Sequence, residues 1–398
     1  MFNCTIQPQK TYTGAGCYKK AILDLKNEGR KNIILISDAV TQAQGKLAML
    51  EAELATQGLR FSTVLASSAS SFDEALELAR KAAPELPDCF ISFGVDFINF
   101  VAKMMWAYYE NPQLDIERLH TNFADAMQGL APTIVTGRKA TLLAIPGAYM
   151  LGGEYGPYVM LPDREGKLKA FIDPALLPDR LAVDPCLLVT VDAAILAADG
   201  FDAFTHCVEC FVADGEDETV KLHCLAGMAD VFRYLPTLVK NQDDIRAKTK
   251  VINGFMHAGV VFSNLFSGIT HSMTTALQAK FGIAHGVANA MTLPHAIEFL
   301  MQSNSVVRQR YAHAARHLGL EGDSEEELVM KLIAAIQDFK EVIGIPANIK
   351  ALGVDSVRYL LSVDAMAHTA ASYQSTQYSP VPADISGFRR ILASAYDE

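Results

Sequence analysis

The order of hydrophobic patterns along the chain constrains its fold more than any other feature. In residues 1–187, short apolar runs alternate with amphipathic stretches whose apolar side chains recur at helical spacing. From residue 188 onward, alanine-rich stretches with helical spacing dominate. The first pattern predicts a parallel β-sheet with helices on both faces, and the second predicts an all-α fold. We therefore expect two domains, an α/β domain in residues 1–187 and a helical domain in residues 188–398.

The expected elements follow from these patterns. Strands are expected at residues 31–38, 61–66, 88–94, 141–146 and 158–161, with helices at 18–28 and 72–83. In the second domain, helices are expected at residues 193–213, 219–241, 245–277, 285–301, 305–318 and 324–343. A chain of 398 residues is long enough for a sizeable core in each of two domains.

Charge and composition exclude several classes of protein. The net charge of −11 argues against a nucleic-acid partner, because phosphates favour a basic face. No run of about 18 apolar residues is present, so no membrane span is expected. The first ten residues, MFNCTIQPQK, lack the basic and apolar regions of a secretory signal. The seven scattered cysteines favour free thiols in a reducing cytosol, so we expect a cytoplasmic protein.

Four residues of the second domain have the types and spacing of a metal site. Asp202 and His206 are four positions apart, so both side chains project from one face of a helix. His271 and His285 follow in a second region. One carboxylate and three imidazoles suit Fe²⁺ or Zn²⁺ and leave a coordination position for a substrate oxygen. A metal with an open position polarises the oxygen of an alcohol or carbonyl. Taken singly, the same residues also suit a helix cap, an ion-pair partner or core histidines.

Around these residues the sequence resembles the iron-containing alcohol dehydrogenase family (group III). The similarity is strongest in residues 197–209 (AADGFDAFTHCVE), 262–264 with 268–271 (FSN and GITH) and 285–295 (HGVANAMTLPH). The resemblance implies an N-terminal Rossmann-like domain followed by a C-terminal helical domain, the dehydroquinate synthase-like architecture. It also implies hydride transfer between NAD(P) and a small alcohol or aldehyde at a ferrous or zinc ion.

The resemblance assigns roles to individual residues. The family's metal positions map onto Asp202, His206, His271 and His285. Asp38 matches the acidic residue that binds the adenosine ribose and favours NAD, because a carboxylate accepts from ribose hydroxyls and repels a 2′-phosphate. The other implied cofactor positions are Gly94, Val95, Asp96, Gly147 and Ala148. Lys103, retained from a family motif, and Thr275 are the candidate catalytic residues.

The segments that correspond to the cofactor loops depart from the family pattern. The family carries Gly-Gly-Gly-Ser, whose backbone approaches the pyrophosphate at a helix N-terminus, where residues 94–97 of this chain read GVDF. The next segment, Pro-Thr-Thr-Ala-Gly-Thr-Gly-Ser-Glu in the family, reads PGAYMLGGE at 146–154. Thr275 replaces a relay histidine, and a hydroxyl passes on a hydrogen bond without holding a proton near neutral pH. All four positions that correspond to metal ligands are retained, whereas the segments that correspond to the nicotinamide cofactor loops are altered.

Several further residues have two interpretations. Glu209 matches a family carboxylate and either supports a metal ligand or is structural. Cys207 and Cys210 form a Cys-x-x-Cys pair that we interpret as small hydrophobic residues rather than thiolate ligands. The substrate pocket is expected to be apolar, with Tyr149, Met150, Phe266 and Phe281 as lining candidates.

Three functions remain open at the level of sequence. The first, which we expect, is a metal-dependent NAD(P)-linked oxidoreductase that interconverts a small alcohol and its aldehyde or ketone. It would use Fe²⁺, alternatively Zn²⁺, with NAD(H) or NADP(H), and act on a small-molecule substrate as a homodimer, as is common in the family. The second is a metal enzyme that has lost nicotinamide binding and performs non-redox Lewis-acid chemistry. The third is a non-catalytic member whose metal ties helices together.

Overall fold

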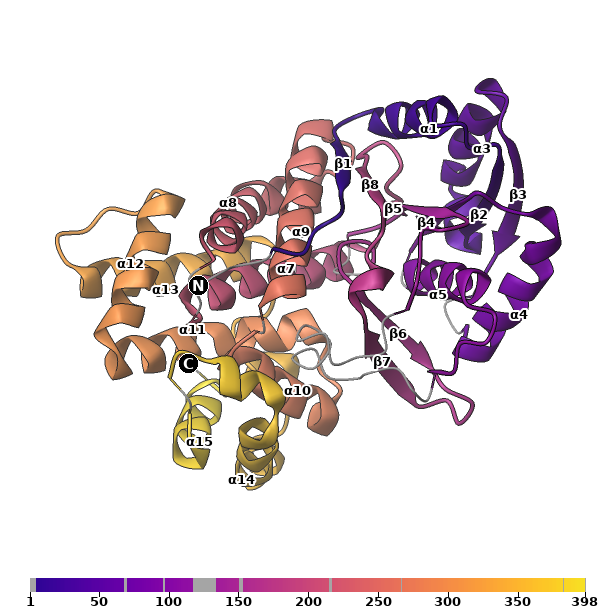
Figure 1. Cartoon of the computed structure of the whole chain (residues 1–398). Helices are drawn as coiled ribbons and strands as arrows, with labels where there is room; N and C mark the ends of the chain where they lie inside the picture. The colour runs from indigo at the N-terminus through magenta and orange to yellow at the C-terminus, as the bar shows by residue number, and fades with distance from the viewer. Residues whose placement is uncertain are drawn as a thin grey trace. The chain divides into compact units, whose positions relative to one another are not determined.

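The chain forms two compact units in the computed structural model, which describes residues 5–67, 70–95, 97–116, 134–149, 153–214, 217–265, 267–381 and 383–397. Residues 6–191 form an α/β unit, and residues from 192 onward, together with Thr5, form a helical unit. Figure 1 shows the strands in the first unit and the helices of the second, coloured red to yellow. The predicted combination of a parallel-sheet fold and an all-α fold is confirmed.

The α/β unit is built on a six-stranded sheet in the order β1-β8-β5-β4-β2-β3, in which every neighbouring pair is parallel. A two-stranded sheet, β6-β7, is antiparallel. The elements are β1 (Lys10–Thr13), α1 (Cys17–Asn27), β2 (Asn32–Ser37), α2 (Ala39–Ala43), α3 (Lys46–Thr56), β3 (Arg60–Leu65), α4 (Phe72–Ala82), β4 (Cys89–Gly94), α5 (Ile98–Glu110), β5 (Thr141–Pro146), β6 (Tyr158–Pro162), β7 (Leu168–Ile172) and β8 (Arg180–Val183).

Helices cover both faces of the large sheet, which explains its continuous apolar strands. Successive side chains of a strand point to opposite faces. Ile33 and Leu35 of β2 therefore pack with α1 and α3, whereas Ile34 and Ile36 pack with α4 and α5. A strand that is buried on both faces has no polar positions to alternate with, so β2 reads as an unbroken apolar run.

Several elements of the α/β unit differ from the sequence-based expectation, since β7, β8, α2, α3 and α5 were also not expected. The strand expected at 158–161 forms, but as β6 it pairs antiparallel with β7 rather than joining the parallel sheet. An apolar run does not specify the partner of a strand, since pairing is decided by the turn and by the surrounding packing. The edge strand β1 was missed because it has four residues, KTYT, of which three are exposed.

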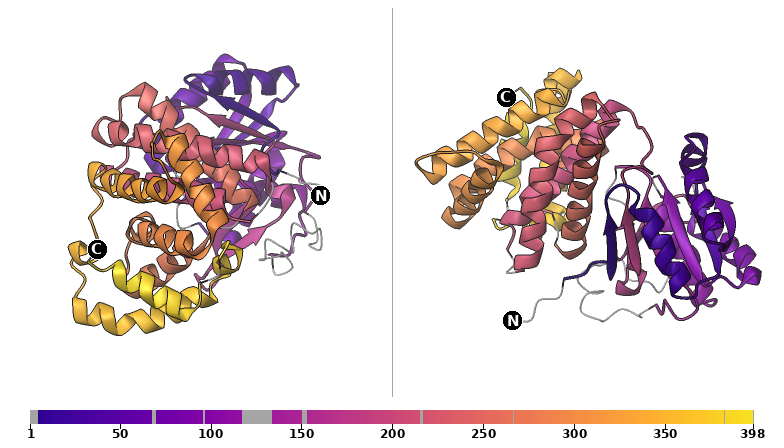
Figure 2. Two further views of the ribbon diagram at one scale, coloured as in Figure 1. Left: turned by 90° about the vertical axis from the view of Figure 1, so that its left-hand side faces the viewer. Right: turned by 90° about the horizontal axis from the view of Figure 1, so that it is seen from above.

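The helical unit contains long helices that mostly begin at capping residues. Five helices start with a side chain that accepts a hydrogen bond from a backbone amide of the first turn. These capping residues are Asp192, Asp217, Asp244, Asn304 and Ser324. In both views of Figure 2 these helices pack on one another. The helices are α7 (Ala193–Val212), α8 (Glu218–Lys240), α9 (Ile245–Asn264), α10 (Ile269–Phe281), α11 (His285–Ser303), α12 (Ser305–Leu318), α13 (Glu325–Val342), α14 (Ser356–Ser372) and α15 (Ile385–Ser394).

The single helix expected at 245–277 is wrong, because the structure contains two helices there. α9 ends at Asn264, and α10 begins at Ile269 after Gly268, whose φ of −104° and ψ of −148° are not helical. The amides of Gly268 and Thr270 donate to the Glu209 carboxylate of α7. A residue from another helix thus stabilises the start of α10, and this contact is not visible in the local sequence. Within the part of the chain that the structure describes, no helix has both the length and the apolar character needed to cross a bilayer.

The start of α11 makes a very close contact with α7. A Cβ atom added at Gly286 would overlap the carbonyl oxygen of Ala198 and would lie 2.5 Å from the carbonyl carbon. Only glycine permits this approach of two backbones. The contact lies one residue after His285 on α11 and one turn before Asp202 on α7, so it brings two predicted metal residues close together.

Replacing Gly286 with alanine is expected to destabilise the helical unit strongly. The new methyl group meets rigid backbone rather than a movable side chain, so the helices must separate, at a cost of about 3 kcal/mol. For a unit of this size we expect the melting temperature to fall by roughly 6–12 °C in thermal unfolding. Gly387→Ala is the matched control, because its Cβ would meet the Phe299 ring at 3.1 Å, and a side chain can move. Equal melting temperatures for the two variants would contradict the expectation.

Candidate metal centre

Three helices of the helical unit bring together the four residues predicted as metal ligands. Asp202 and His206 lie one turn apart on α7, His271 lies in the first turn of α10, and His285 is the first residue of α11. The Nε2 atoms of His206, His271 and His285 lie 3.7, 3.4 and 3.6 Å from Oδ1 of Asp202. His206 Nε2 and His271 Nε2 are 3.1 Å apart. The four side chains thus converge on one point.

The donor atoms fit a divalent cation. Asp202, His271 and His285 each offer one ligand atom, and these atoms all lie within 4.8 Å of one another. In a tetrahedral site, ligands at about 2.0–2.2 Å from the ion lie about 3.3–3.6 Å apart, close to the 3.4–3.7 Å that separates the histidine nitrogens from Asp202 Oδ1. His206 adds a fourth nitrogen beside two of these atoms. One carboxylate and three imidazoles suit Fe²⁺ or Zn²⁺.

Glu209 determines which nitrogen of His271 faces the other ligands. Its buried carboxylate lies 2.6 Å from His271 Nδ1 and also accepts from the backbone amides of Gly268 and Thr270. Although burial favours the neutral acid, these hydrogen bonds hold the pKa of Glu209 below its usual value. An ionised carboxylate only accepts, so His271 Nδ1 donates and Nε2 points toward Asp202. Metal-bound histidines are typically held by a carboxylate in this way.

The protonation of the histidines follows from their surroundings. Burial lowers the pKa of His206 to about 3, so its ring is neutral and keeps a nitrogen lone pair. Burial also disfavours the charged form of His271, but hydrogen bonds to Asp202 and Glu209 outweigh it and raise the pKa to about 9. Among the described residues, no hydrogen-bond partner faces Nδ1 of His206. The rings of Phe262 and His206 pack edge-on, with their centroids 4.9 Å apart.

Two polar residues of the site were not predicted from the sequence. The Asn289 side chain of α11 donates to Asp202 Oδ1 at 2.6 Å, and its Oδ1 accepts from Thr274 Oγ1 of α10 at 2.6 Å. Both side chains are completely buried. Asn289 follows His285 by four positions, and Thr274 follows His271 by three. This helical spacing from a predicted ligand is the signal that identifies them.

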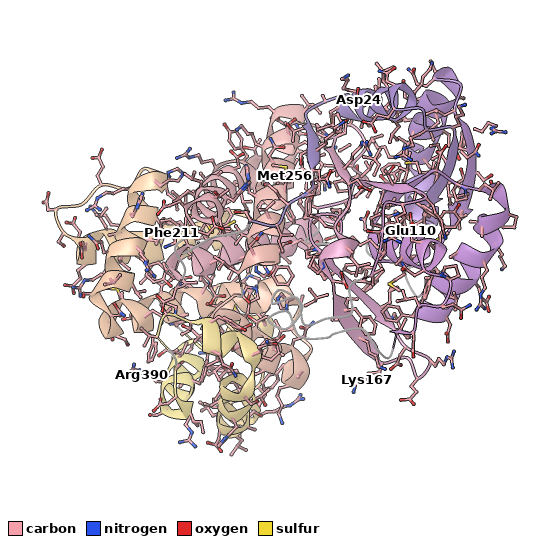
Figure 3. All side chains as sticks on the ribbon, in the orientation of Figure 1. Asp24, Glu110, Lys167, Phe211, Met256 and Arg390 are labelled. Carbon is pink, nitrogen blue, oxygen red and sulfur yellow. The ribbon has the colours of Figure 1, made fainter. Side chains whose placement is uncertain are left out.

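The rest of α7 packs into the core of the helical unit. Cys207 and Cys210 are fully buried, and burial raises the pKa of both thiols. Phe211, labelled in Figure 3, packs edge-on against His313 of α12 with ring centroids 5.4 Å apart. The two cysteines are therefore surrounded as small apolar residues are, in agreement with their interpretation from sequence.

The two candidate catalytic residues both donate hydrogen bonds to backbone carbonyl groups. Thr275 Oγ1 donates to the carbonyl of His271, one turn earlier in α10, at 3.0 Å. Lys103 of α5 is buried in the α/β unit, and its Nζ donates to the carbonyls of Gly156 and Tyr158. Burial lowers the pKa of Lys103 to about 7. Thr275 thus neighbours a metal residue, whereas Lys103 holds the segment that leads into β6, and their catalytic roles stay predictions.

The predicted cofactor residues meet at one edge of the sheet, where β2, β4 and β5 end. Asp38 caps α2, since its Oδ1 accepts from Thr41 N at 2.8 Å. Its Oδ2 accepts from Thr41 Oγ1 at 2.7 Å and from Val95 N at 3.0 Å. Gly147 N donates to Gly94 O at 2.9 Å, and a Cβ at Gly147 would lie 2.6 Å from that oxygen. Hydrogen bonds therefore join Asp38 to Val95 and Gly147 to Gly94.

Two backbone amides at this edge are not directed to a ligand as they would be in a glycine-rich phosphate cradle. Such a cradle presents backbone amides to the ligand, but the amides of Val95 and Gly147 donate within the chain. Ala148 is buried. The predicted positions Asp96, Met150 and Phe266 lie outside the described residues. Of the expected pocket residues that the structure describes, Tyr149 is buried in the α/β unit, and Phe281 stacks on Tyr359 of α14.

Comparison with known proteins gives matches over nearly the whole chain. A model described as iron-containing alcohol dehydrogenase matches residues 8–185, and one for the C-terminal part of the Fe-containing alcohol dehydrogenase family matches residues 196–396. The chain is similar to the bifunctional aldehyde-alcohol dehydrogenase AdhE of Escherichia coli (strain K12), with 29% identity over 98% of the chain and 46% of the relative. It thus spans about half the length of that relative.

One further relative and one solved structure match over nearly their full length. The NADPH-dependent butanol dehydrogenase of Clostridium saccharobutylicum is 26% identical over 98% of the chain and 97% of the relative. The solved structure of an iron-containing alcohol dehydrogenase from Thermococcus thioreducens has a TM-score of 0.83 at 22% identity, covering 100% of this chain and 99% of that one. At that identity the structural match establishes the fold.

Replacing Glu209 with glutamine is expected to weaken metal binding and to destabilise α10. A glutamine has one acceptor oxygen and a donating amide, so it cannot accept from Thr270 N and His271 Nδ1 together. We expect the metal dissociation constant to rise about 10- to 100-fold in a chelator competition. The unfolding free energy of the metal-free protein should fall by about 1–3 kcal/mol. Glu341→Gln, on the exposed face of α13, is the control, and unchanged metal affinity in Glu209→Gln would contradict the role given to Glu209.

Replacing Asp38 with alanine separates a structural role from a cofactor role. The change removes the cap of α2 and the acceptor for Val95 N, so the unfolding free energy should fall by about 1–3 kcal/mol in denaturant titration. Because the carboxylate is already bound within the chain, we expect the ratio of NADH to NADPH affinity to stay unchanged. Thr41→Val, which removes one hydrogen bond to Asp38, is the control. A gain in NADPH affinity at unchanged stability would instead assign Asp38 to the ribose.

Proposed function

Because the chain belongs to the iron-containing alcohol dehydrogenase family, we propose that it is a metal-dependent, NAD(P)-linked oxidoreductase that interconverts a small alcohol and its aldehyde or ketone. One observation carries the proposal, namely the three imidazole nitrogens that lie 3.4–3.7 Å from a single oxygen of Asp202. The proposal is supported by the proteins to which the chain is similar, which include an aldehyde-alcohol dehydrogenase and a butanol dehydrogenase.

The proposed metal residues are Asp202, His206, His271 and His285. When bound there, a divalent cation polarises the oxygen of an alcohol or a carbonyl group and stabilises the negative charge that develops on it. The family favours iron, and the ligand set suits zinc equally well. Glu209 supports this assignment, because it holds His271 Nε2 toward Asp202 and leaves Nδ1 as the donor.

The chain's own residues can orient the site and move a proton. Asn289 holds the Asp202 carboxylate, and Glu209 holds His271. Thr275 Oγ1 donates to the carbonyl of His271, so its oxygen still has lone pairs that can accept. We assign to Thr275 Oγ1 a relay in which it accepts the substrate hydroxyl proton while its own hydrogen turns from the His271 carbonyl to a water molecule and is released there. A hydroxyl passes such a proton on without storing it, which distinguishes it from the histidine usual at this position in the family.

A second candidate function follows from the sheet edge. The Asp38 carboxylate accepts three hydrogen bonds from Thr41 and Val95, so a ribose would have to compete with the chain for it. This favours an enzyme that retains the metal residues but has lost nicotinamide binding. Such an enzyme would use the cation for non-redox Lewis-acid chemistry such as an elimination or hydrolysis. The homodimer and the cytoplasmic location expected from the sequence stay predictions.

Metal reconstitution with a nicotinamide assay distinguishes these functions. The purified chain is stripped with a chelator, reloaded anaerobically with Fe²⁺ or Zn²⁺, and mixed with NADH or NADPH and a series of short aldehydes. We expect loss of reduced-nicotinamide absorbance only when metal, cofactor and aldehyde are all present. His285→Ala, which removes one metal residue, should abolish turnover.

The other outcomes are equally specific. No cofactor binding at millimolar NADH or NADPH, with one metal bound per chain, would falsify the redox proposal and leave the Lewis-acid candidate. Metal binding that raises the melting temperature, without turnover of any aldehyde or alcohol in either direction, would support a non-catalytic role. Turnover that is unaffected by His285→Ala would place the reaction elsewhere in the molecule.

A further inference from the structure

Two buried side chains, Thr274 of α10 and Asn289 of α11, are hydrogen-bonded to each other, and Asn289 also donates to the carboxylate of Asp202 on α7. We propose that Asn289 and Thr274 form a positioning pair that sets the orientation of the Asp202 carboxylate for the metal. The inference rests on the proposed metal site, and it concerns two residues that do not themselves offer ligand atoms of the predicted kind. Both side chains are completely shielded from solvent.

The contacts form a chain across three helices. Thr274 Oγ1 of α10 donates to Asn289 Oδ1 at 2.6 Å, and Asn289 Nδ2 of α11 donates to Asp202 Oδ1 at 2.6 Å. The same Nδ2 lies 3.4 Å from His271 Nε2. The Asn289 amide therefore faces the centre of the metal site, and its opposite end is held by the Thr274 hydroxyl.

The chemistry of the partners determines which way the amide points. The Asp202 carboxylate only accepts hydrogen bonds, so the NH₂ end of Asn289 must face it. The carbonyl end then lies in the core, where a buried oxygen without a donor is costly, and the Thr274 hydroxyl supplies that donor. A flipped amide would place its oxygen against the carboxylate. Thr274 thereby favours a single orientation of Asn289.

The carboxylate of Asp202 needs such a partner. The terminal torsion of an aspartate is broad, so helix geometry alone does not fix the plane in which the Asp202 carboxylate faces the histidines. Asn289 Nδ2 lies 2.6 Å from Asp202 Oδ1, which is closer than the nearest histidine nitrogen, at 3.4 Å. Asn289 also shares α11 with His285. One amide therefore couples the position of α11 to the orientation of a ligand on α7.

This pair is distinct from the contact that Glu209 makes. Glu209 lies on α7, and its carboxylate contacts Nδ1 of His271 and the amide of Thr270 at the start of α10. Thr274 lies one turn further along α10 and acts on Asp202 through Asn289. The two predicted ligands Asp202 and His271 are thus oriented by separate groups, as is typical of metal sites whose ligands need fixed directions.

Metal affinity and metal spectroscopy test the proposal. The variants Thr274→Val and Asn289→Leu keep the approximate side-chain volume but remove the hydrogen bonds. A third variant, Thr274→Ser, retains the hydroxyl and loses only a methyl group. The control is Thr292→Val on α11, equally buried, whose hydroxyl donates to the carbonyl of Ala288 in its own helix. Each chelator-stripped protein is titrated with Zn²⁺ against a competing chelator, and the visible spectrum of its Co²⁺ form is recorded.

We expect Thr274→Val and Asn289→Leu to raise the Zn²⁺ dissociation constant about 10-fold or more and to change the Co²⁺ spectrum. Thr274→Ser should match the unmodified chain in both measurements, and so should Thr292→Val. If Thr274→Val and Asn289→Leu retain full affinity and spectrum while Asp202→Asn loses the metal, the positioning pair is overturned and the metal site stands. If Asp202→Asn also binds normally, the proposed metal site is wrong and the pair falls with it.

Discussion

The contact between two backbones, Gly286 of α11 and Ala198 of α7, is the constraint on which the candidate metal centre depends. Because no side chain separates them, α11 begins directly against the helix that carries Asp202. His285 and Asn289 reach Asp202 as a consequence, and α10 completes the set with His271. The centre is therefore a product of helix packing rather than of loop conformation, and helices hold such residues more firmly than loops do.

The two halves of the chain differ in how their polar groups are used. In the helical unit, Glu209 and Asn289 direct their hydrogen bonds to residues that converge on one point. At the edge of the sheet, Asp38 directs its hydrogen bonds to Thr41 and Val95, which holds the strand ends together. Buried polar groups have to be satisfied in either case. In the helical unit, these contacts leave the ligand atoms of Asp202 and His271 facing a common centre. In the α/β unit, the hydrogen bonds of Asp38 join neighbouring segments of the fold.

Much of the fold could be predicted because its signals are local. The strands β2, β4 and β5 are buried on both faces, and helices such as α7 and α12 have apolar periodicity and a capping residue. The four candidate metal residues were predicted from spacing and resemblance, and the structure brings their side chains together. The break between α9 and α10 was missed, since it depends on Glu209 from another helix. Asn289 was missed for a similar reason, because its amide acquires a role only after α11 packs on α7.

Glu209 links the architecture to the chemistry in a way that affects how this protein can change over time. One carboxylate receives the first amides of α10 and also the ring of His271. A substitution there acts on folding and on the candidate metal residues at once, so selection for a stable chain also preserves the candidate metal centre.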